Sequence, residues 1–198
     1  MNMEMPRRYE QKKRALRQQE TRQRILDAVV ELHETVGPAR TSVSAVAARA
    51  GVERPTVYRH FPDEPSMLAA CSAHFRARHP RPDAKSWSRI HDPEERLRVA
   101  LESLYLHYAE TEAMTANVLR DAAVIPALAE LIAPTRKQMS AMPELLLRGW
   151  KARGARRQRL RAALAHAAAF TTWRSLVAEQ GLDREDAVNL MVALARSA

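Results

Sequence analysis

The sequence has almost none of the residues from which disulfides and most metal sites are built. Cys71 is the only cysteine among 198 residues, which excludes an intramolecular disulfide and any multi-cysteine metal site. The seven histidines show no HExxH or paired-ligand spacing, so no metal and no other cofactor is expected. We interpret Cys71 as a small buried apolar residue, with a redox sensor as the alternative.

Signatures of catalysis and of membrane insertion are missing as well. There is no GxSxG motif and no glycine-rich phosphate loop, so the sequence does not predict an enzyme. The longest nearly apolar run, residues 162–170, is interrupted by His166 and is too short to cross a bilayer. Residues 1–14 carry charge with no apolar stretch behind them, unlike a secretory signal. We therefore expect a soluble, cytoplasmic protein with no membrane partner.

The excess of basic charge, +9 in all, is distributed unevenly along the chain. Residues 1–80 hold 14 basic and 9 acidic side chains, and residues 81–135 hold 6 and 9. Residues 136–198 hold 12 and 5, with seven basic residues between 148 and 161. A basic N-terminal third beside an acidic middle indicates a directed contact with a polyanion. Charge alone does not separate DNA from RNA or anionic lipid.

Apolar residues recur with helical period along the chain, and no stretch alternates as a strand does. Between Ile25 and Val36 they fall at three- and four-residue steps, and Gly37-Pro38 then ends the helix. Near the C-terminus the pattern predicts a long helix over about 157–179 and a last helix over about 186–195, capped by Asp183. The fold class predicted is all-α, with about nine helices.

The most informative stretch runs from Thr41 to Leu68 and predicts two short helices joined by a turn at Gly51. Pro55 is tolerated only in a first helical turn, so the second of these helices begins near residue 53 or 54. Val57 and Phe61 lie four residues apart and are expected to anchor that helix inward. This arrangement over residues 42–61 is typical of a helix-turn-helix, whose second helix enters the DNA major groove.

The outward side chains of that second helix suit a DNA groove. Arg54 can form a bidentate contact with a guanine, and Thr56 can touch a thymine methyl. Tyr58 and His60 are placed to hold phosphates. Each alone would more often be an ordinary surface residue, and only the surrounding motif favours DNA contact.

The stretch AVAARAGVERPTVYRHFPDEPSML resembles the DNA-binding signature of the tetracycline-repressor (TetR) family. The resemblance covers about residues 19–79 and implies a homodimeric transcriptional regulator, most often a repressor released from a palindromic operator by a small-molecule effector. The polar, non-periodic N-terminus predicts a basic arm at 1–18, and the break at His79-Pro80-Arg81-Pro82 predicts a domain boundary. With the resemblance, this gives a three-helix DNA-binding head at 19–79 and a larger helical effector-binding and dimerisation domain at 80–198. The implied DNA contacts are Thr41, Ser42, Ser44, Arg54, Pro55, Thr56, Tyr58, Arg59 and His60.

One position departs from the family pattern. Many members have a phosphate-binding lysine just after the His-Phe pair, where this chain has Asp63-Glu64-Pro65. We expect residues 1–14 to be a mobile basic arm and the N-terminal segment to compensate. Its basic residues are Arg7, Arg8, Lys12, Lys13, Arg14, Arg17, Arg22 and Arg24.

Two further groups of residues are candidates in the C-terminal domain. Large adaptable side chains that suit a mostly apolar effector pocket are Leu104, Tyr105, Tyr108, Met114, Leu119, Met139, Met142, Trp150 and Trp173. Tyr105, Tyr108 or His107 would supply polar contacts, although core packing is the favoured interpretation of any single residue. The dimer interface implied for the last two helices involves His166, Phe170, Trp173, Val177, Val188, Met191 and Val192.

The leading function is therefore a sequence-specific DNA-binding regulator, with double-stranded DNA, a second copy of the chain and a small effector as partners. The alternative is a non-specific, architectural DNA-binding protein without an effector, which would use the basic arm and the basic run 148–161. The ratio of specific to non-specific affinity distinguishes the two.

Overall fold

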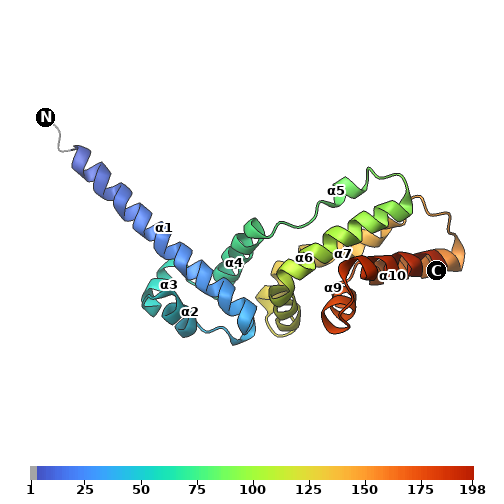
Figure 1. The fold of residues 1–198 in the computed structure, drawn as a ribbon. Helices are drawn as coiled ribbons and strands as arrows, with labels where there is room; N and C mark the ends of the chain where they lie inside the picture. Colours follow the sequence, from blue (N-terminus) through green and yellow to red (C-terminus); the bar gives the residue numbers. More distant parts are fainter. Residues whose placement is uncertain (1–3) are drawn as a thin grey trace. The chain divides into compact units, whose positions relative to one another are not determined.

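The computed structural model describes residues 4–198, with side chains from Tyr9 onward. All regular structure in this range is helical: ten α-helices, one short 3-10 helix and one π-helical turn (Figure 1). The predicted all-α fold is confirmed.

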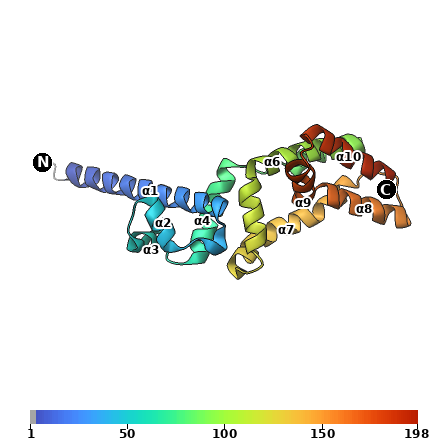
Figure 2. The same cartoon turned by 60° about the horizontal axis from the view of Figure 1, so that its bottom comes forward.

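The chain forms two compact units. The first consists of Met1–Arg78 and Ala116–Leu131, and the second of His79–Thr115 and Ile132–Ala198. Helices α6 (Pro93–Asp121) and α7 (Pro126–Leu146) therefore contribute to both, and a short turn joins them (Figure 2). The sequence pattern predicted that everything after residue 79 would form the second domain. Residues 116–131 differ because the end of α6 is hydrogen-bonded to the end of α1.

The first unit is built on α1 (Glu4–Thr35), followed by η1 (Pro38–Arg40), α2 (Val43–Ala50), α3 (Arg54–His60) and α4 (Glu64–Arg78). Helix α1 packs against α2 and α4, and α2 packs against α3. The core includes Ile25, Val29, Val46 and Val57, each with no exposed surface. The apolar stripe predicted for residues 25–36 therefore faces the core as expected.

The expectation of a mobile arm over residues 1–14 is wrong from Glu4 onward, because α1 begins there. Residues 1–3 lie outside the described residues, as do the side chains of Arg7 and Arg8. The segment lacks an apolar stripe, but it is rich in Glu, Gln, Lys and Arg, which are strong helix formers. Extending a helix that is already nucleated costs far less than starting one, so the helix continues without a core contact.

The second unit contains α5 (Ala84–Trp87), α8 (Gly154–Ala167), α9 (Phe170–Trp173), η2 (Arg174–Glu179) and α10 (Arg184–Ser197). The prediction of one long helix over 157–179 is wrong, because the helix is interrupted between Ala167 and Phe170. The hydroxyls of Tyr105 and Tyr108 donate to the carbonyls of Ala167 and Ala168, each at 2.8 Å. These tertiary hydrogen bonds satisfy carbonyls that an interrupted helix leaves unpaired.

The predicted cap of the last helix is confirmed. The Asp183 carboxylate accepts a hydrogen bond from the backbone N–H of Asp186 at 2.7 Å. This contact satisfies one of the free donors at the start of α10.

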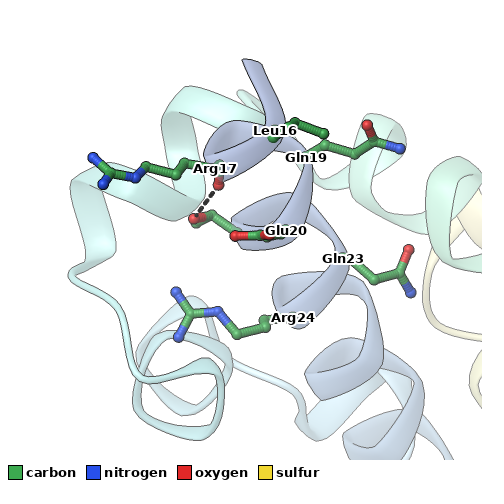
Figure 3. Close-up of a pocket in the computed structure, with 7 residues that line it drawn as sticks. Leu16, Arg17, Gln19, Glu20, Gln23 and Arg24 are labelled. Atoms are coloured by element: carbon green, nitrogen blue, oxygen red, sulfur yellow. Dashed lines mark hydrogen bonds between the residues drawn. The ribbon is translucent and has the colours of Figure 1, made fainter. Parts of the chain in front are cut away.

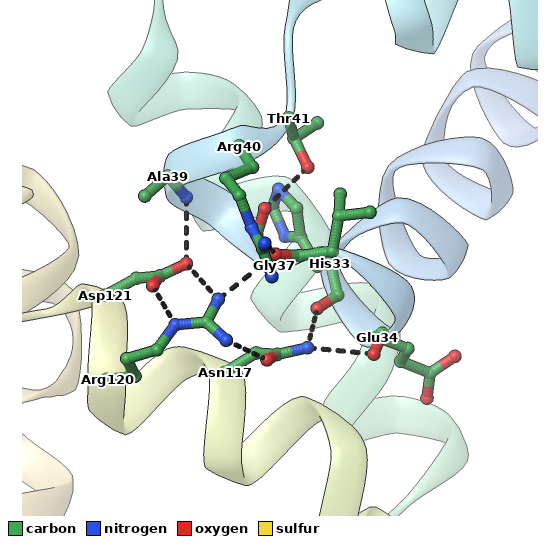
Figure 4. Close-up of polar contacts among 10 residues, drawn as sticks. His33, Glu34, Gly37, Ala39, Arg40, Thr41, Asn117, Arg120 and Asp121 are labelled. Atoms are coloured by element: carbon green, nitrogen blue, oxygen red, sulfur yellow. Dashed lines mark hydrogen bonds and ion pairs between the residues drawn. The ribbon is translucent and has the colours of Figure 1, made fainter.

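Polar side chains of α6 hold the C-terminal end of α1 within the first unit (Figure 4). The Asn117 amide donates to the carbonyls of His33 and Glu34 at 2.9 and 2.8 Å. The Arg120 guanidinium donates to the Val36 carbonyl at 3.1 Å. The last carbonyls of a helix have no partner within it, so these contacts cap α1 from a distant segment.

The turn after α1 depends on the same cluster. Asp121 accepts the backbone N–H of Ala39 at 2.9 Å and pairs with Arg120. The hydrogen bond from Arg120, followed by that from Ala39, holds the pKa of the Asp121 carboxyl below its usual range. Gly37 has a φ of 93°, and a β-carbon there would collide with the guanidinium of Arg120. Only glycine fits this turn.

His33 and Cys71 form a buried pair in the core of the first unit. The Nδ1 atom of His33 lies 3.5 Å from the Cys71 sulfur. Burial lowers the pKa of His33 to about 4, against a smaller opposite effect of the Asp121 charge. Burial also raises the pKa of the Cys71 thiol to about 12. A buried thiol that stays protonated is an apolar core residue, so the structure supports that interpretation over a redox sensor.

The buried imidazole predicts a loss of stability in mild acid. The folded pKa of His33 lies below its unfolded value of 6.5. The unfolded chain therefore binds the extra proton, and stability is complete above pH 6.5 and lost as the pH falls toward 4. Each pH unit in this window costs about 1.4 kcal/mol. From pH 7 to pH 5 the loss is about 2 kcal/mol.

The measurement is urea unfolding at pH 7 and pH 5 for the wild type, His33→Gln and the exposed control His91→Gln. His33→Gln should lose about 2 kcal/mol less than the wild type between the two pH values, because glutamine does not titrate. An equal loss in all three proteins contradicts the assignment.

Candidate nucleic-acid interface

The predicted helix-turn-helix has the expected boundaries. Ser42 caps α2, and its hydroxyl accepts the backbone N–H of Ala45 at 3.1 Å. Gly51 ends α2 in the left-handed conformation with a φ of 63°. Arg54 then begins α3, and Pro55 lies in its first turn as predicted.

Helix α3 presents one face to the core and the other to solvent. Val57 has no exposed surface and Phe61 only 3%, so both predicted anchors are confirmed. Arg54, Pro55, Tyr58 and Arg59 are exposed, while Thr56 and His60 are half-buried. The polar residues predicted to contact DNA on α3 therefore share an accessible surface that two buried side chains hold in place.

The candidates before α3 differ in how free their hydroxyls are. Thr41 is half-buried and donates to the Gly37 carbonyl at 2.9 Å. Ser42 is engaged in capping α2, and Ser44 is exposed on its first turn. Ser42 and Ser44 are both exposed, and the hydroxyls of Thr41 and Ser42 take part in the local structure at the start of α2.

Asp63, one of the acidic residues found where the resembling family often has a lysine, has a structural role. The Asp63 carboxylate accepts the backbone N–H of Ser66 at 2.7 Å. It thereby caps α4, which begins at Glu64. Both carboxylates are exposed, and their charge opposes a phosphate at this end of α4.

A basic groove of about 400 Å³ lies between α1 and α3. It is lined from α1 by Arg14, Arg17, Gln18, Thr21 and Arg24, and from the turn and α3 by Val52, Glu53, Thr56, Arg59 and His60. Sequence reasoning counted the basic residues of α1 but did not place them beside α3. The two segments are about 35 residues apart in the sequence, and no local pattern links them.

Arginine side chains of α1 and α3 interact with residues at the C-terminal end of α3 and with Phe61, which follows it. The Arg59 guanidinium donates to the Thr56 hydroxyl at 3.1 Å. The Arg22 guanidinium lies over the Phe61 ring, 4.8 Å from its centre, a cation–π contact. Partial burial lowers the pKa of His60, and the charges of Arg59 and then Arg22 lower it further. His60 is therefore a neutral hydrogen-bonding group near pH 7.

Most candidate effector residues are buried in the second unit. Leu104, Tyr105, Tyr108, Met114, Met142 and Trp173 are buried, while Met139 and Trp150 are half-buried. Leu119 belongs to the first unit and is 40% exposed. Tyr108 packs edge-on against Phe170 and also contacts Trp173, with ring centres 5.5 and 6.0 Å apart.

Two polar atoms in the second unit stand out. Among the described residues, Nδ1 of His107 and Nε1 of Trp150 are buried without a hydrogen-bond partner. Burial lowers the pKa of His107, and the charge of Arg81 adds to that effect. By contrast, the hydroxyl protons of Tyr105 and Tyr108 are already donated to backbone carbonyls.

The candidate dimer residues form a buried group and a more exposed group. Phe170, Trp173, Val188, Met191 and Val192 are at most 8% exposed in the single chain, so they have little surface to offer a partner. His166 is exposed and Val177 half-buried. The large exposed apolar residues of α10 are instead Leu190 and Leu194, 47% and 39% exposed and one turn apart.

The basic run 148–161 is partly neutralised. Arg157 and Arg161 both pair with Glu144, at 3.0 and 2.8 Å. Arg159 donates to the carbonyl of Ala198 at 3.3 Å. Exposed pairs of this kind contribute little to stability.

Neither a metal site nor a membrane span is found in the part of the chain that the structure describes. No group of three or more His, Cys, Asp or Glu side chains comes together there. No helix there combines the length and apolar character needed to cross a bilayer.

Comparison with known proteins identifies this architecture. A family profile described as "Bacterial regulatory proteins, tetR family" matches residues 25–71, from the buried part of α1 into α4. No curated protein sequence matches the chain.

Several solved structures are similar over nearly the whole chain. A TetR-like transcriptional regulator from a Rhodococcus species is 22% identical with a TM-score of 0.62, covering 89% of this chain and 93% of its own. The TetR family regulator PfmR from Thermus thermophilus is 18% identical with a TM-score of 0.62, covering 87% and 97%. The transcriptional regulator FadR from Bacillus subtilis, in complex with stearoyl-CoA, is 17% identical with a TM-score of 0.56, covering 87% and 96%.

Proposed function

The chain has a TetR-type helix-turn-helix region and the fold of TetR-family transcriptional regulators, and from this premise we propose that it is a sequence-specific DNA-binding regulator. The observation that carries the proposal is the solvent face of α3. Arg54, Tyr58 and Arg59 are exposed there, while Val57 and Phe61 anchor the opposite face. A helix presented in this way fits the major groove, where base edges can be read.

The proposed regulator is a homodimer that binds a palindromic operator. One α3 reads only a few base pairs, and a two-fold dimer places a second copy about 34–36 Å away in the next major groove. Helices α8 and α10 pack together within the chain. We propose that α10 contributes Leu190 and Leu194 to a four-helix interface with the same pair of the partner, alongside His166 and Val177.

The proposed effector binds in the second unit and releases the DNA. Helix α6 carries His107 in the second unit and Asn117 and Arg120 in the first. A ligand that displaced the second-unit part of α6 would therefore act on the residues that cap α1. The buried, unpartnered Nδ1 of His107 is the polar contact proposed for a mostly apolar ligand.

The competing function is a non-specific, architectural DNA-binding protein. The observation that favours this alternative is the basic charge of the N-terminal third. It does not require the ordered face of α3.

Selection of bound fragments from a random DNA pool tests the central proposal. We expect a palindromic consensus bound about 10³-fold or more tightly than random DNA. A pool without a consensus would favour the architectural alternative.

The variant Arg54→Ala should lose roughly 1–3 kcal/mol of DNA-binding free energy, mainly at one base position. The control Arg89→Ala removes the same charge from an exposed site in the second unit and should leave the base preference unchanged.

Light scattering at micromolar concentration tests the dimer. Leu190→Glu with Leu194→Glu should give a monomer, because each leucine buried at an interface contributes about 2 kcal/mol and a buried unpaired carboxylate costs more. Leu106→Glu changes a leucine of similar exposure on α6, 46%, and should leave the dimer intact. A wild-type monomer would contradict the proposal.

Thermal unfolding with acyl-CoA ligands tests the effector site, starting from stearoyl-CoA because FadR binds it. A ligand at 100 times its Kd stabilises a protein by about 2.7 kcal/mol. The stabilising ligand should also release DNA, and His107→Ala should lose both effects while the exposed control His91→Ala keeps them. Equal responses of the two variants would remove His107 from the site.

A further inference from the structure

Helix α1 extends well beyond the core that it supports. Its first fully buried side chain is Ile25, whereas residues 9–20 are all exposed. The stretch from residue 9 to 24, exposed except at the half-buried Thr21, is roughly 24 Å long at 1.5 Å per residue. It runs past α3 in Figure 1. Solvent-exposed helix of this length gains nothing from core packing, and its composition indicates what it contacts instead.

The exposed part of α1 is strongly basic. Between residues 9 and 24 it holds six basic side chains and two acidic ones, Glu10 and Glu20. Arg14, Arg17 and Arg24 lie three and seven residues apart, which places them on one side of the helix. Figure 3 shows Arg17 and Arg24 extending to the same side, with Gln19 and Gln23 on the opposite side.

That basic side of α1 faces α3 across the groove described above. Thr56 and Arg59 of α3 form the other wall, so four arginines face the single carboxylate of Glu53. The hydrogen bond between Arg59 and Thr56 holds that guanidinium at the groove. The local field is positive, since nearby guanidinium charges also lower the pKa of His60.

We propose that the groove between α1 and α3 binds a DNA backbone phosphate, so that α1 is a second DNA-contacting helix beside the recognition helix. Arginines bind phosphate oxygens in bidentate geometry, and the groove adjoins the exposed face that carries Arg54 and Tyr58. The acidic start of α4 at Asp63 and Glu64 repels phosphate, so the anchor shifts to α1. The inference rests on the proposed DNA-binding function.

The test compares the wild type with Arg17→Ala/Arg24→Ala, and with Lys85→Ala/Arg89→Ala as the matched control. Both pairs remove two exposed positive charges, but only the first pair lines the groove, and the second pair lies in the second unit. Fluorescence anisotropy against salt concentration is measured on the selected operator and on a random duplex. One lost phosphate contact should lower the salt slope by about 0.9 on both DNAs. The control should change the slope by much less.

A second measurement locates the phosphate. Neutral methylphosphonates are placed one at a time along the operator. A methylphosphonate at one position in each half-site should weaken binding by the wild type and by the Lys85→Ala/Arg89→Ala control about tenfold, yet leave binding by Arg17→Ala/Arg24→Ala unaffected. Helical circular dichroism equal to that of the wild type shows that the variant is folded.

The outcomes separate this inference from the proposed function. Specific binding with equal salt slopes and equal methylphosphonate profiles in all three proteins overturns the groove and leaves the regulator intact. A wild type that selects no operator overturns the proposed regulator. The groove is then supported if the arginine variant alone loses slope on random DNA, and overturned if it does not.

Discussion

The surface proposed to face DNA depends on the burial of Val57 and Phe61. Helix α3 has only seven residues, far too few to be stable alone in water. Its position and rotation therefore come from these two anchors, both almost fully buried. Because the anchors lie four residues apart, the opposite face, with Arg54 and Tyr58, must point outward. A packing interaction thus determines which polar groups of α3 are exposed to solvent.

The same dependence on tertiary contact appears at the other end of the head. The end of α1 and the turn at Gly37 are held by Asn117, Arg120 and Asp121, which belong to α6. A helix end that would otherwise be solvated is capped by side chains about 80 residues away. Helix α6 thus contributes the cap of α1 in the first unit and His107, the proposed effector contact, in the second.

Charge and geometry act together in the first unit. Exposed arginines scattered over a surface would give weak, salt-sensitive attraction to any polyanion. In this chain Arg17 and Arg24 share a groove with Arg59, and Asp63 caps α4 where a positive charge is often found in the resembling family. This distribution concentrates the positive charge beside the exposed face of α3, the face proposed to read DNA.

Much of the fold was predictable because its signals are local. The three- and four-residue apolar steps, the turn at Gly51, Pro55 in a first turn and the Asp183 cap each act within a few residues. They determined the all-α class and the bounds of the helix-turn-helix. The break after Ala167 was not predictable, because Tyr105 and Tyr108 stabilise it from 60 residues away. The sequence by itself determined α3, the proposed reading helix, and its charge. Only the tertiary structure decided that α1 would continue to Glu4, that its arginines would line a groove with α3, and that Phe170 and Val188 would be core. Those outcomes depend on contacts between segments that are far apart in the sequence, and no local sequence pattern specifies such contacts.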